Sequence, residues 1–249
     1  MALNERQNDV LKILKEKKTA TVTQLSKLLY VSEATLRRDL KAMQAMGLVE
    51  RTHGGARLRE NVDEISLFFR MEKNAEQKQK AAFAALRRLP TFHCVFIDSS
   101  STALALAQRL DLRGKTVVTN GLQTALVLSK KENVNVLLLG GTIQPAALSA
   151  TGSLSTRLIA EFSFDLCICS CAAIAGSSAY ERSIEQAELK RAALSVSTHA
   201  VLLADSSKFF ASAPYRTAEL SRFDFVATDA PPQTVLESVT FIYENNPTR

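Results

Sequence analysis

The sequence lacks any long apolar run. No stretch approaches the roughly 20 apolar residues that a membrane-spanning helix needs. Residues 1–18 are charged throughout and contain no apolar core of the kind found in a secretory leader. These absences argue against a bilayer span, and we expect a cytoplasmic protein.

Cysteine and histidine are also scarce, with four and three copies among 249 residues. Cys167, Cys169 and Cys171 alternate along the chain, so on a strand they share one face. No histidine or fourth cysteine stands beside them at the spacing of zinc ligands. We therefore expect buried apolar thiols in a reducing compartment, with no metal site and no cofactor.

Nearly all of the chain's excess positive charge lies in the N-terminal quarter. Residues 1–60 hold twelve Lys and Arg against seven Asp and Glu, whereas the other 189 residues hold nineteen against eighteen. A cationic segment binds phosphate backbones because binding releases counterions. This asymmetry favours nucleic-acid binding by the N-terminal part of a chain whose length suits two domains.

Capping signals predict two helices in the first thirty residues. Asn4 is placed to cap a helix over about 5–17. Thr21 and Gln24 fit a capping box, in which each side chain satisfies a free backbone donor of the other residue. That box opens a short second helix, which we expect to end near Leu29.

A third helix and a hairpin complete the pattern. Ser32 is placed to cap a helix that runs to about Met46, where Gly47 ends it by adopting the left-handed conformation. Residues 48–58, around Gly54-Gly55, predict a wing hairpin. Apolar residues recur at helical spacing in the third helix and leave its basic side chains exposed. Three helices with this tight second turn predict a winged helix-turn-helix.

The exposed face of the third helix predicts DNA contacts. In such domains the first half of the recognition helix touches base edges, and neighbouring side chains touch phosphates. We predict Arg37 as the main base reader, Lys41 as a phosphate contact and Asp39 as a structural partner of a neighbouring arginine. The candidate DNA-binding residues are Ser32, Glu33, Ala34, Thr35, Arg37, Arg38 and Lys41 on the helix, and Arg51, His53 and Arg57 on the wing.

From about residue 74 the pattern alternates between strand and helix. Candidate strands are 94–97, 116–119, 134–139, 166–171, 200–204, 225–228 and 240–243. Candidate helices are 75–89, 102–110, 122–129, 153–162 and 184–197. Most of the strands are continuous apolar runs, as expected of parallel strands covered on both faces. We predict an α/β chain with a DNA-binding domain over 1–58, a linker over 59–73, and an open, mostly parallel sheet domain over 74–249.

Polar loops follow several of the predicted strands. Open parallel sheets bind ligands at the carboxyl ends of their strands. The loops 98–102, 119–121, 140–142 and 205–208 supply hydroxyls, glycines and backbone donors, and Lys190 is able to face the same cleft. Ser/Thr runs also act as simple helix caps. Taken together, the loops favour a small phosphorylated polyol or sugar as ligand.

The chain resembles DeoR-type bacterial transcriptional regulators along nearly its whole length. The resemblance rests on SEATLRRDL, GLVERTHGGA, DSSSTALALA, VVTNG, LLGGT and VLLADSSKF, in that order. It implies a winged helix-turn-helix that binds operator DNA and a domain similar to ribose-5-phosphate isomerase that senses a phosphorylated sugar. It also implies a homodimer or homotetramer, and a repressor of a sugar operon that its ligand relieves. The implied effector residues are Asp98, Ser99, Ser101, Thr102, Thr119, Asn120, Gly140, Gly141, Lys190, Asp205 and Lys208, with Ser100 in the same loop.

Three departures from the family pattern bear on the ligand. Ser100 replaces a glycine, and Gln144 replaces a frequent arginine. Residues 170–173, Ser-Cys-Ala-Ala, replace an element that carries an acidic residue and two glycines. Either the ligand differs from the usual one or the pocket binds it weakly, and we favour a changed ligand.

Two other functions compete with this interpretation. In one, the protein binds DNA and its C-terminal domain only oligomerises. In the other, the chain is a sugar-phosphate isomerase, because fold alone does not settle function. Isomerisation needs a positioned base. Ala172 and Ala173 stand where a carboxylate would be sought, and nothing in the sequence poises Asp98 with Asp205. We therefore expect no catalytic residues and no enzyme.

Overall fold

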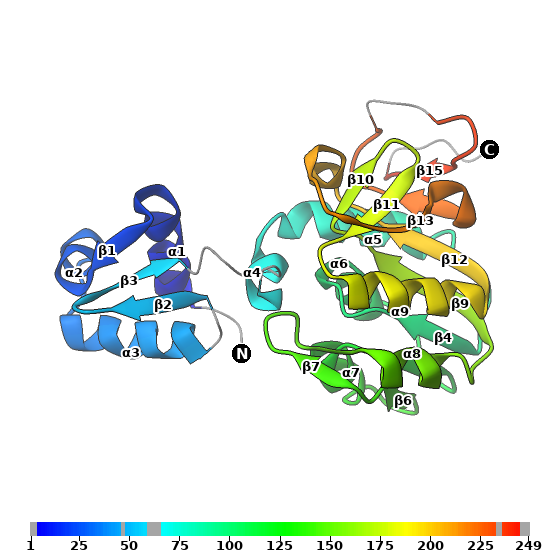
Figure 1. Cartoon of the computed structure of the whole chain (residues 1–249), viewed down its shortest axis with the longest axis horizontal. Coiled ribbons are helices and arrows are strands. Elements are labelled where there is room, and N and C mark those ends of the chain that lie inside the picture. The colour runs from blue at the N-terminus through cyan, green and yellow to red at the C-terminus, as the bar shows by residue number, and fades with distance from the viewer. Residues whose placement is uncertain (1–3, 46–47, 59–65, 233–235, 245–249) are drawn as a thin grey trace. The chain divides into compact units, whose positions relative to one another are not determined.

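A computed structural model describes residues 4–45, 48–58, 66–232 and 236–244 of the chain (Figure 1). The chain divides into two compact units, Met1–Arg70 and Met71–Arg249. Helix α4 (Leu67–Glu72) lies across this division, within the segment expected to be a linker. Residues 59–65, the first part of the expected linker, lie outside the described residues. No helix in the described part of the chain combines the length and apolar character that a bilayer span requires.

The smaller unit is a helix-turn-helix with a wing. Its elements are α1 (Glu5–Lys17), β1 (Thr19–Thr21), α2 (Val22–Leu29), α3 (Glu33–Ala45), β2 (Val49–Thr52) and β3 (Gly55–Leu58). The predicted capping box at Thr21 is present, and the predicted cap Asn4 also forms a capping box, with Gln7. The Ser32 hydroxyl accepts the Thr35 N–H at 3.2 Å, as expected of the cap of α3. Met46 and Gly47, the expected end of this helix, lie outside the described residues.

The predicted wing is confirmed, but it belongs to a larger sheet. Strands β2 and β3 pair in antiparallel fashion around Gly54, whose φ is +85°. The short strand β1, which sequence patterning did not predict, pairs with the other edge of β3. A Cβ atom at Gly55 would lie 2.3 Å from the carbonyl oxygen of Ala20, so only glycine permits this approach.

A small apolar core and one ion pair hold α3 in place. Leu36, Leu40 and Met43 of α3 are fully buried with side chains of α1, α2 and the wing. Asp39 accepts a hydrogen bond from Arg6 of α1, with 2.5 Å between Nε and Oδ2. The predicted structural role of Asp39 is confirmed. Its partner arginine comes from a helix 33 residues away rather than from a neighbouring position.

The larger unit is built on a parallel sheet of seven strands in the order β15-β14-β12-β9-β4-β5-β6. The strands are β4 (Cys94–Ile97), β5 (Thr116–Thr119), β6 (Asn135–Leu138), β9 (Phe164–Ser170), β12 (Ser197–Leu203), β14 (Phe225–Ala227) and β15 (Phe241–Ile242). The helices are α5 (Ala75–Leu86), α6 (Ser101–Ala107), α7 (Leu122–Leu128), α8 (Ser153–Ile159) and α9 (Ile184–Ser195). Each predicted strand and helix is present, with ends shifted by a few residues, and the open parallel α/β sheet is confirmed.

Helices cover both faces of this sheet (Figure 1). One apolar cluster joins alternate strand residues to α5, α6 and α7, and contains Val95, Val117 and Leu128. The other cluster joins the opposite strand residues to α8 and α9, and contains Phe96, Val118 and Ile159. The expectation that strands are covered on both faces is wrong for β6, because this strand lies at the edge of the sheet and most of its residues are exposed.

The larger unit also contains short antiparallel strands that the sequence did not predict. Strands β10 (Ala173–Ala175), β11 (Ser178–Glu181) and β13 (Tyr215–Glu219) form a separate three-stranded sheet. Strands β7 (Thr142–Gln144) and β8 (Ser149–Thr151) form a hairpin after β6. These strands are only three to five residues long, and the alternation that would identify them is too short to recognise. Short 3₁₀ turns, η1 (Ser206–Phe210) and η2 (Leu220–Arg222), follow β12 and β13.

Candidate functional site

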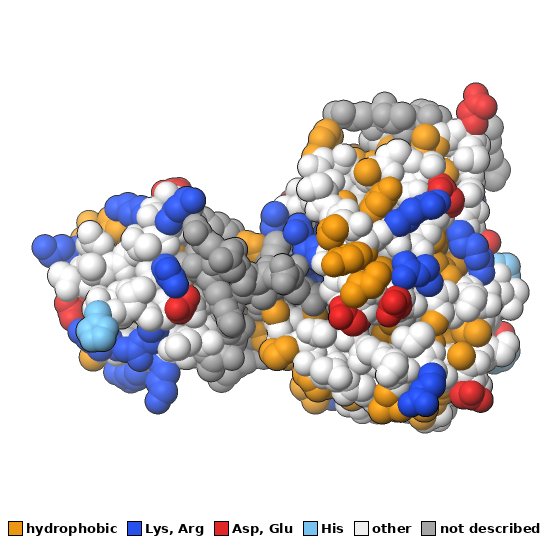
Figure 2. All heavy atoms as spheres, viewed as in Figure 1, with side chains coloured by type: hydrophobic (Ala, Val, Ile, Leu, Met, Phe, Trp, Pro, Cys, Tyr) orange, Lys and Arg blue, Asp and Glu red, His pale blue; other side chains and the backbone are white. Residues whose placement is uncertain are grey.

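The outer face of α3 is basic. Arg37, Arg38 and Lys41 are exposed, whereas Leu36, Leu40 and Met43 of the same helix are buried. Figure 2 shows basic side chains gathered over this helix in the smaller unit. A helix held by its buried face and cationic on its exposed face has the properties needed to enter a DNA groove.

Arg37 is held by its neighbours within the predicted base-reading part of α3. Its Nη2 lies 3.2 Å from Oε2 of Glu33, one turn earlier. The other carboxylate oxygen of Glu33 accepts a hydrogen bond of 2.6 Å from the Thr23 hydroxyl of α2. The hydrogen bond from Thr23, followed by the hydrogen bond from Arg37, lowers the pKa of Glu33. Glu33 therefore stays ionised at neutral pH and links α2 to the guanidinium of Arg37.

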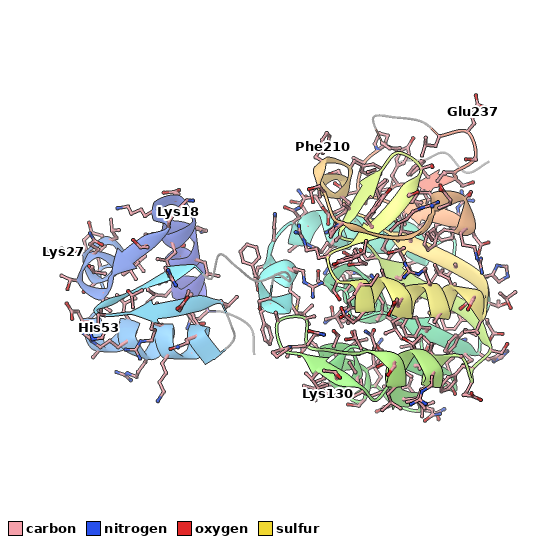
Figure 3. The ribbon with its side chains drawn as sticks, in the orientation of Figure 1. Lys18, Lys27, His53, Lys130, Phe210 and Glu237 are labelled. Carbon is pink, nitrogen blue, oxygen red and sulfur yellow. The ribbon has the colours of Figure 1, made fainter. Side chains whose placement is uncertain are left out.

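The remaining candidate DNA contacts lie on the same unit. Ala34 is exposed at the start of α3, and the hydroxyls of Ser32 and Thr35 lie 2.9 Å apart. His53 lies at the turn between β2 and β3 (Figure 3) and, like Arg51, is exposed. Arg57 of β3 is also exposed, but its Nη2 donates to Glu50 across the hairpin at 2.9 Å. Part of its charge is therefore already neutralised within the wing.

A buried charge cluster lies at the carboxyl ends of β4 and β9. Nζ of Lys190, on α9, is 2.8 Å from Oδ2 of Asp98 and also donates to Glu181 of β11 and, at 2.6 Å, to the carbonyl of Ser170. Asp98 in turn accepts from the backbone N–H groups of Ser100 and Ser170 at 2.9 and 3.0 Å. The structure thus brings together Asp98, Ser100 and Lys190 from the predicted set.

This cluster contains two carboxylates and one ammonium group. Burial by itself lowers the pKa of Lys190, but the adjacent charges of Asp98 and Glu181 outweigh burial and hold it well above its usual value. Lys190 is therefore protonated and already has both counter-charges inside the protein. The charge of Lys190 is therefore already balanced by Asp98 and Glu181 and is not available to bind a ligand phosphate.

Asp205 lies in a second cluster, after β12. Its Oδ1 accepts from Nδ2 of Asn74 at 3.2 Å and from the N–H of Ser207 at 3.2 Å. Nζ of Lys78, on α5, lies 4.0 Å from Oδ2, and both side chains are buried. Lys208 lies in η1, three residues further on, and is half-buried. Asp205 and Lys208 are thus grouped with the start of α5, a connection that the sequence did not suggest.

The predicted residues after β5 and β6 are grouped with the β7–β8 hairpin. Asn120 donates to the carbonyl of Ala150 at 3.2 Å, and the Gly140 carbonyl accepts from the Ser155 hydroxyl at 2.6 Å. Gly141 has a φ of +149°, and a Cβ atom there would lie 2.2 Å from the Ser155 hydroxyl oxygen. Thr119 accepts the Gly121 N–H at 3.0 Å.

The remaining residues of the predicted effector loop are buried at the start of α6. Ser99 lies beneath Gly121, where an added Cβ atom would be 2.9 Å from the Ser99 Cα. Ser101 lines a small cavity between α5 and α6 together with Lys78 and Gln79. Thr102 is almost completely buried.

Two buried acceptors in these loops have no hydrogen-bond partner within the described structure, Oδ1 of Asn120 and Oδ2 of Asp205. A buried acceptor that lacks a donor is costly. Hydroxyl groups of a ligand are donors of the required kind. Sequence reasoning did not find Glu181, Asn74 or Lys78, because each is placed by contacts between distant elements and carries no local motif.

The cysteines have the character of apolar core residues. Cys167, Cys169 and Cys171 are buried, Cys94 is half-buried, and all four are free thiols. Burial raises the pKa of Cys171 to about 12, so this thiol stays protonated and unreactive. Within the described residues no group of three or more His, Cys, Asp or Glu side chains is placed to hold a metal ion.

Comparison with known proteins adds an independent line of evidence. Residues 6–62 match the model of the DeoR-like helix-turn-helix domain, and residues 73–230 match that of the DeoR C terminal sensor domain. The chain is 34% identical over 230 residues to the HTH-type transcriptional regulator GolR of Listeria innocua, covering 90% of each chain. It is 30% identical over 234 residues to the glycerol-3-phosphate regulon repressor of Escherichia coli, covering 93% of each. Ribose 5-phosphate isomerase A of Methanocaldococcus jannaschii superposes with a TM-score of 0.40 at 13% identity, over 55% of each chain.

Proposed function

This chain belongs to the DeoR family of transcriptional regulators, and we propose that it represses genes of sugar metabolism until a phosphorylated sugar or polyol releases it from operator DNA. The observation that supports DNA binding most directly is the basic outer face of α3, which is fixed from behind by its core and by the Arg6–Asp39 pair. In this proposal α3 enters the major groove and the wing lies along the backbone.

The relative named as a glycerol-3-phosphate regulon repressor supports a small phosphorylated effector. Our proposal for this chain places that ligand at the carboxyl ends of the sheet. Asn120 and Asp205 accept hydrogen bonds from its hydroxyl groups. Because Lys190 is already paired with Asp98 and Glu181, Lys208 is the cation that we assign to the phosphate.

The Asp205 loop suggests how such a ligand affects DNA binding. Asn74 and Lys78, which contact Asp205, lie just after α4 at the start of the larger unit. A ligand that changes the conformation of this loop changes the point at which the chain enters the sheet domain. The ligand can change DNA affinity only as far as it binds the DNA-bound and released conformations of this loop with different affinity, typically about 1–3 kcal/mol.

Substitution of single basic residues on α3 tests the DNA-binding proposal. Arg37→Ala is expected to reduce discrimination between the operator and a mismatched duplex by about 1–3 kcal/mol, since a base contact is lost. Lys41→Ala is expected to weaken both complexes equally, because a phosphate contact carries no sequence information. Duplexes selected from a random library, measured by fluorescence anisotropy, provide both affinities. Equal losses on matched and mismatched DNA for both variants would refute this division of roles.

Ligand binding is testable by thermal unfolding with a panel of phosphorylated sugars and polyols. A ligand that binds only the folded state raises the melting temperature, by an amount that corresponds to about 2.7 kcal/mol at 100 times its Kd. We expect one member of the panel to do so and to weaken operator binding. Lys208→Ala should abolish both responses and leave operator affinity without ligand unchanged. Ligand-enhanced operator binding would reverse the sign of the proposal.

The two competing functions predict different results in the same panel. If no phosphorylated compound alters stability or DNA affinity, a sensor domain that only oligomerises is the better description. The relatives are transcriptional regulators, and we propose no catalysis for this chain. Turnover of ribose 5-phosphate by the purified protein would overturn that statement.

A further inference from the structure

One segment of the larger unit is unusual in having no charged residue. Residues 133–156 are 24 consecutive uncharged residues in a chain that is 22% charged. Residues 116–129, immediately before the Lys130–Glu132 turn, are also uncharged. Together these segments form β5, α7, β6, the β7–β8 hairpin and the start of α8. Depletion of charge is typical of the core of a protein–protein interface.

Large apolar side chains are exposed on the same elements, along the part of the larger unit that Figure 1 labels α7, β6, β7 and α8 (Figure 2). Their relative exposures are 57% for Leu126, 40% for Leu137, 48% for Leu138, 46% for Ile143, 46% for Leu154 and 38% for Leu158. We name β6 together with Leu126 of α7 and Leu154 and Leu158 of α8 the β6 rim. Single exposed leucines are common on protein surfaces, whereas several on neighbouring elements favour a binding surface.

The β6 rim contains an open strand edge. The backbone N–H groups of Asn135 and Leu139 donate to the backbone carbonyls of Lys115 and Thr119, on the β5 side of the strand. Since alternate residues of a strand direct their backbone groups to opposite edges, those of Val136 and Leu138 face away from β5. No strand among the described residues pairs with that side of β6. Natural proteins usually protect such an edge with charged residues or proline, and residues 135–138 contain neither.

Apolar side chains flank this edge on both faces of the sheet. Leu137 is in register with Val118, which belongs to the core under α8 and α9. Leu138 is in register with Thr119 and therefore lies on the opposite face, where α7 packs. On the α8 side, Leu154 and Leu158 approach the Cβ position of Gly140 within 3.8 and 3.9 Å. Leucine side chains therefore flank the open edge of β6 on both faces of the sheet.

We propose that the β6 rim binds the β6 rim of a second copy of this chain, with the two β6 strands antiparallel across a two-fold axis. A free strand edge requires another strand, and an antiparallel copy of the same strand places each outward N–H opposite an outward carbonyl. An uncharged apolar patch is complementary to itself and offers nothing to DNA or to a charged partner. The proposal rests on the operator binding proposed above, because a pair of copies presents two recognition helices to a repeated DNA site.

Sedimentation velocity of the full-length protein over a concentration series tests this surface without DNA. The wild type is expected to be a dimer, or a tetramer that contains this contact. Leu138→Lys should raise the dissociation constant of the contact by about 100-fold or more, because a two-fold axis brings two unpaired charges into one apolar interface. Phe83→Lys on α5, at a side chain that is 44% exposed and outside the rim, is the matched control and should have no effect.

A second pair of variants tests the backbone ladder. Leu138→Ala and Leu138→Pro both remove the leucine side chain, but only proline removes the outward N–H. Proline is tolerated at a strand edge whose N–H points away from the sheet, so the hydrogen bonds to β5 remain. The proline variant should associate at least about tenfold more weakly than the alanine variant, as expected when a ladder bond is lost at each of two symmetric positions.

A monomeric wild type at micromolar concentration would overturn the β6 rim proposal, as would a Leu138→Lys variant whose association is unchanged. If Leu138→Lys fails to unfold cooperatively, Leu126→Lys replaces it, since Leu126 is the most exposed leucine of the rim. A dissociated rim variant should still bind a duplex that contains one half-site. If the wild type associates through β6 but binds no duplex, the interface stands and the proposed function fails.

Discussion

The affinity of the protein for its operator is expected to fall about 10³–10⁵-fold as the salt concentration rises from about 50 to about 200 mM. The proposed DNA surface of one copy includes Arg38, Lys41 and Arg51, all exposed, with Arg57 and His53 on the wing. Two copies on a repeated site therefore make roughly six to ten phosphate contacts, each of which releases a counterion. Fluorescence anisotropy with a selected duplex at four or five salt concentrations provides the slope.

Matched lysine substitutions separate this effect from general charge screening. Lys41→Ala should reduce the slope of log affinity against log salt by about one for each copy bound. Lys80→Ala removes an equally charged side chain of α5 that is paired with Glu76 at 2.7 Å in the larger unit, and should leave the slope unchanged. A wild-type affinity that does not vary with salt would contradict the whole DNA-binding interpretation.

Lys190→Met is expected to destabilise the folded protein by about 3–5 kcal/mol. The substitution leaves the buried carboxylates of Asp98 and Glu181 next to each other without a cation. The pKa of Lys190 is higher in the folded state than in the unfolded chain. The stability that this lysine contributes is therefore fully present at any pH below the pKa of an unfolded lysine. It is lost only when the pH rises through the pKa of Lys190 in the folded protein. The full loss is therefore present at pH 7. Urea unfolding followed by circular dichroism measures it.

The pH dependence of this loss and a matched variant identify its cause. Raising the pH above the ordinary pKa of lysine and through the raised pKa of Lys190 removes the charge of Lys190 in the wild type, so the difference in unfolding free energy between wild type and Lys190→Met should shrink. Lys80→Met makes the same replacement in the exposed Lys80–Glu76 pair and should change stability far less than Lys190→Met, because solvent screens an exposed pair. If both variants lose the same stability, the buried cluster does not have the importance assigned to it.

The fold was predictable where its signals are local. A capping box at Thr21 depends on residues three positions apart, and apolar runs such as residues 94–97 and 116–119 identify strands by composition alone. The antiparallel strands β10, β11 and β13 escaped prediction because they are short and are held mainly by one another. The roles of the DNA-binding and effector residues remain predictions, although the structure places them.

The sequence by itself determined the order of helices and strands, the basic face of α3 and the polar loops at the strand ends, since each depends on residues close together in the chain. Only the tertiary structure decided which side chains meet. Asn74 contacts Asp205 across 131 positions, and Glu181 reaches Lys190 from an unpredicted strand. It also decided that β6 lies at the edge of the sheet with Leu137 and Leu138 exposed. Strand order depends on how distant segments pack, and the apolar run of an edge strand resembles that of a central one.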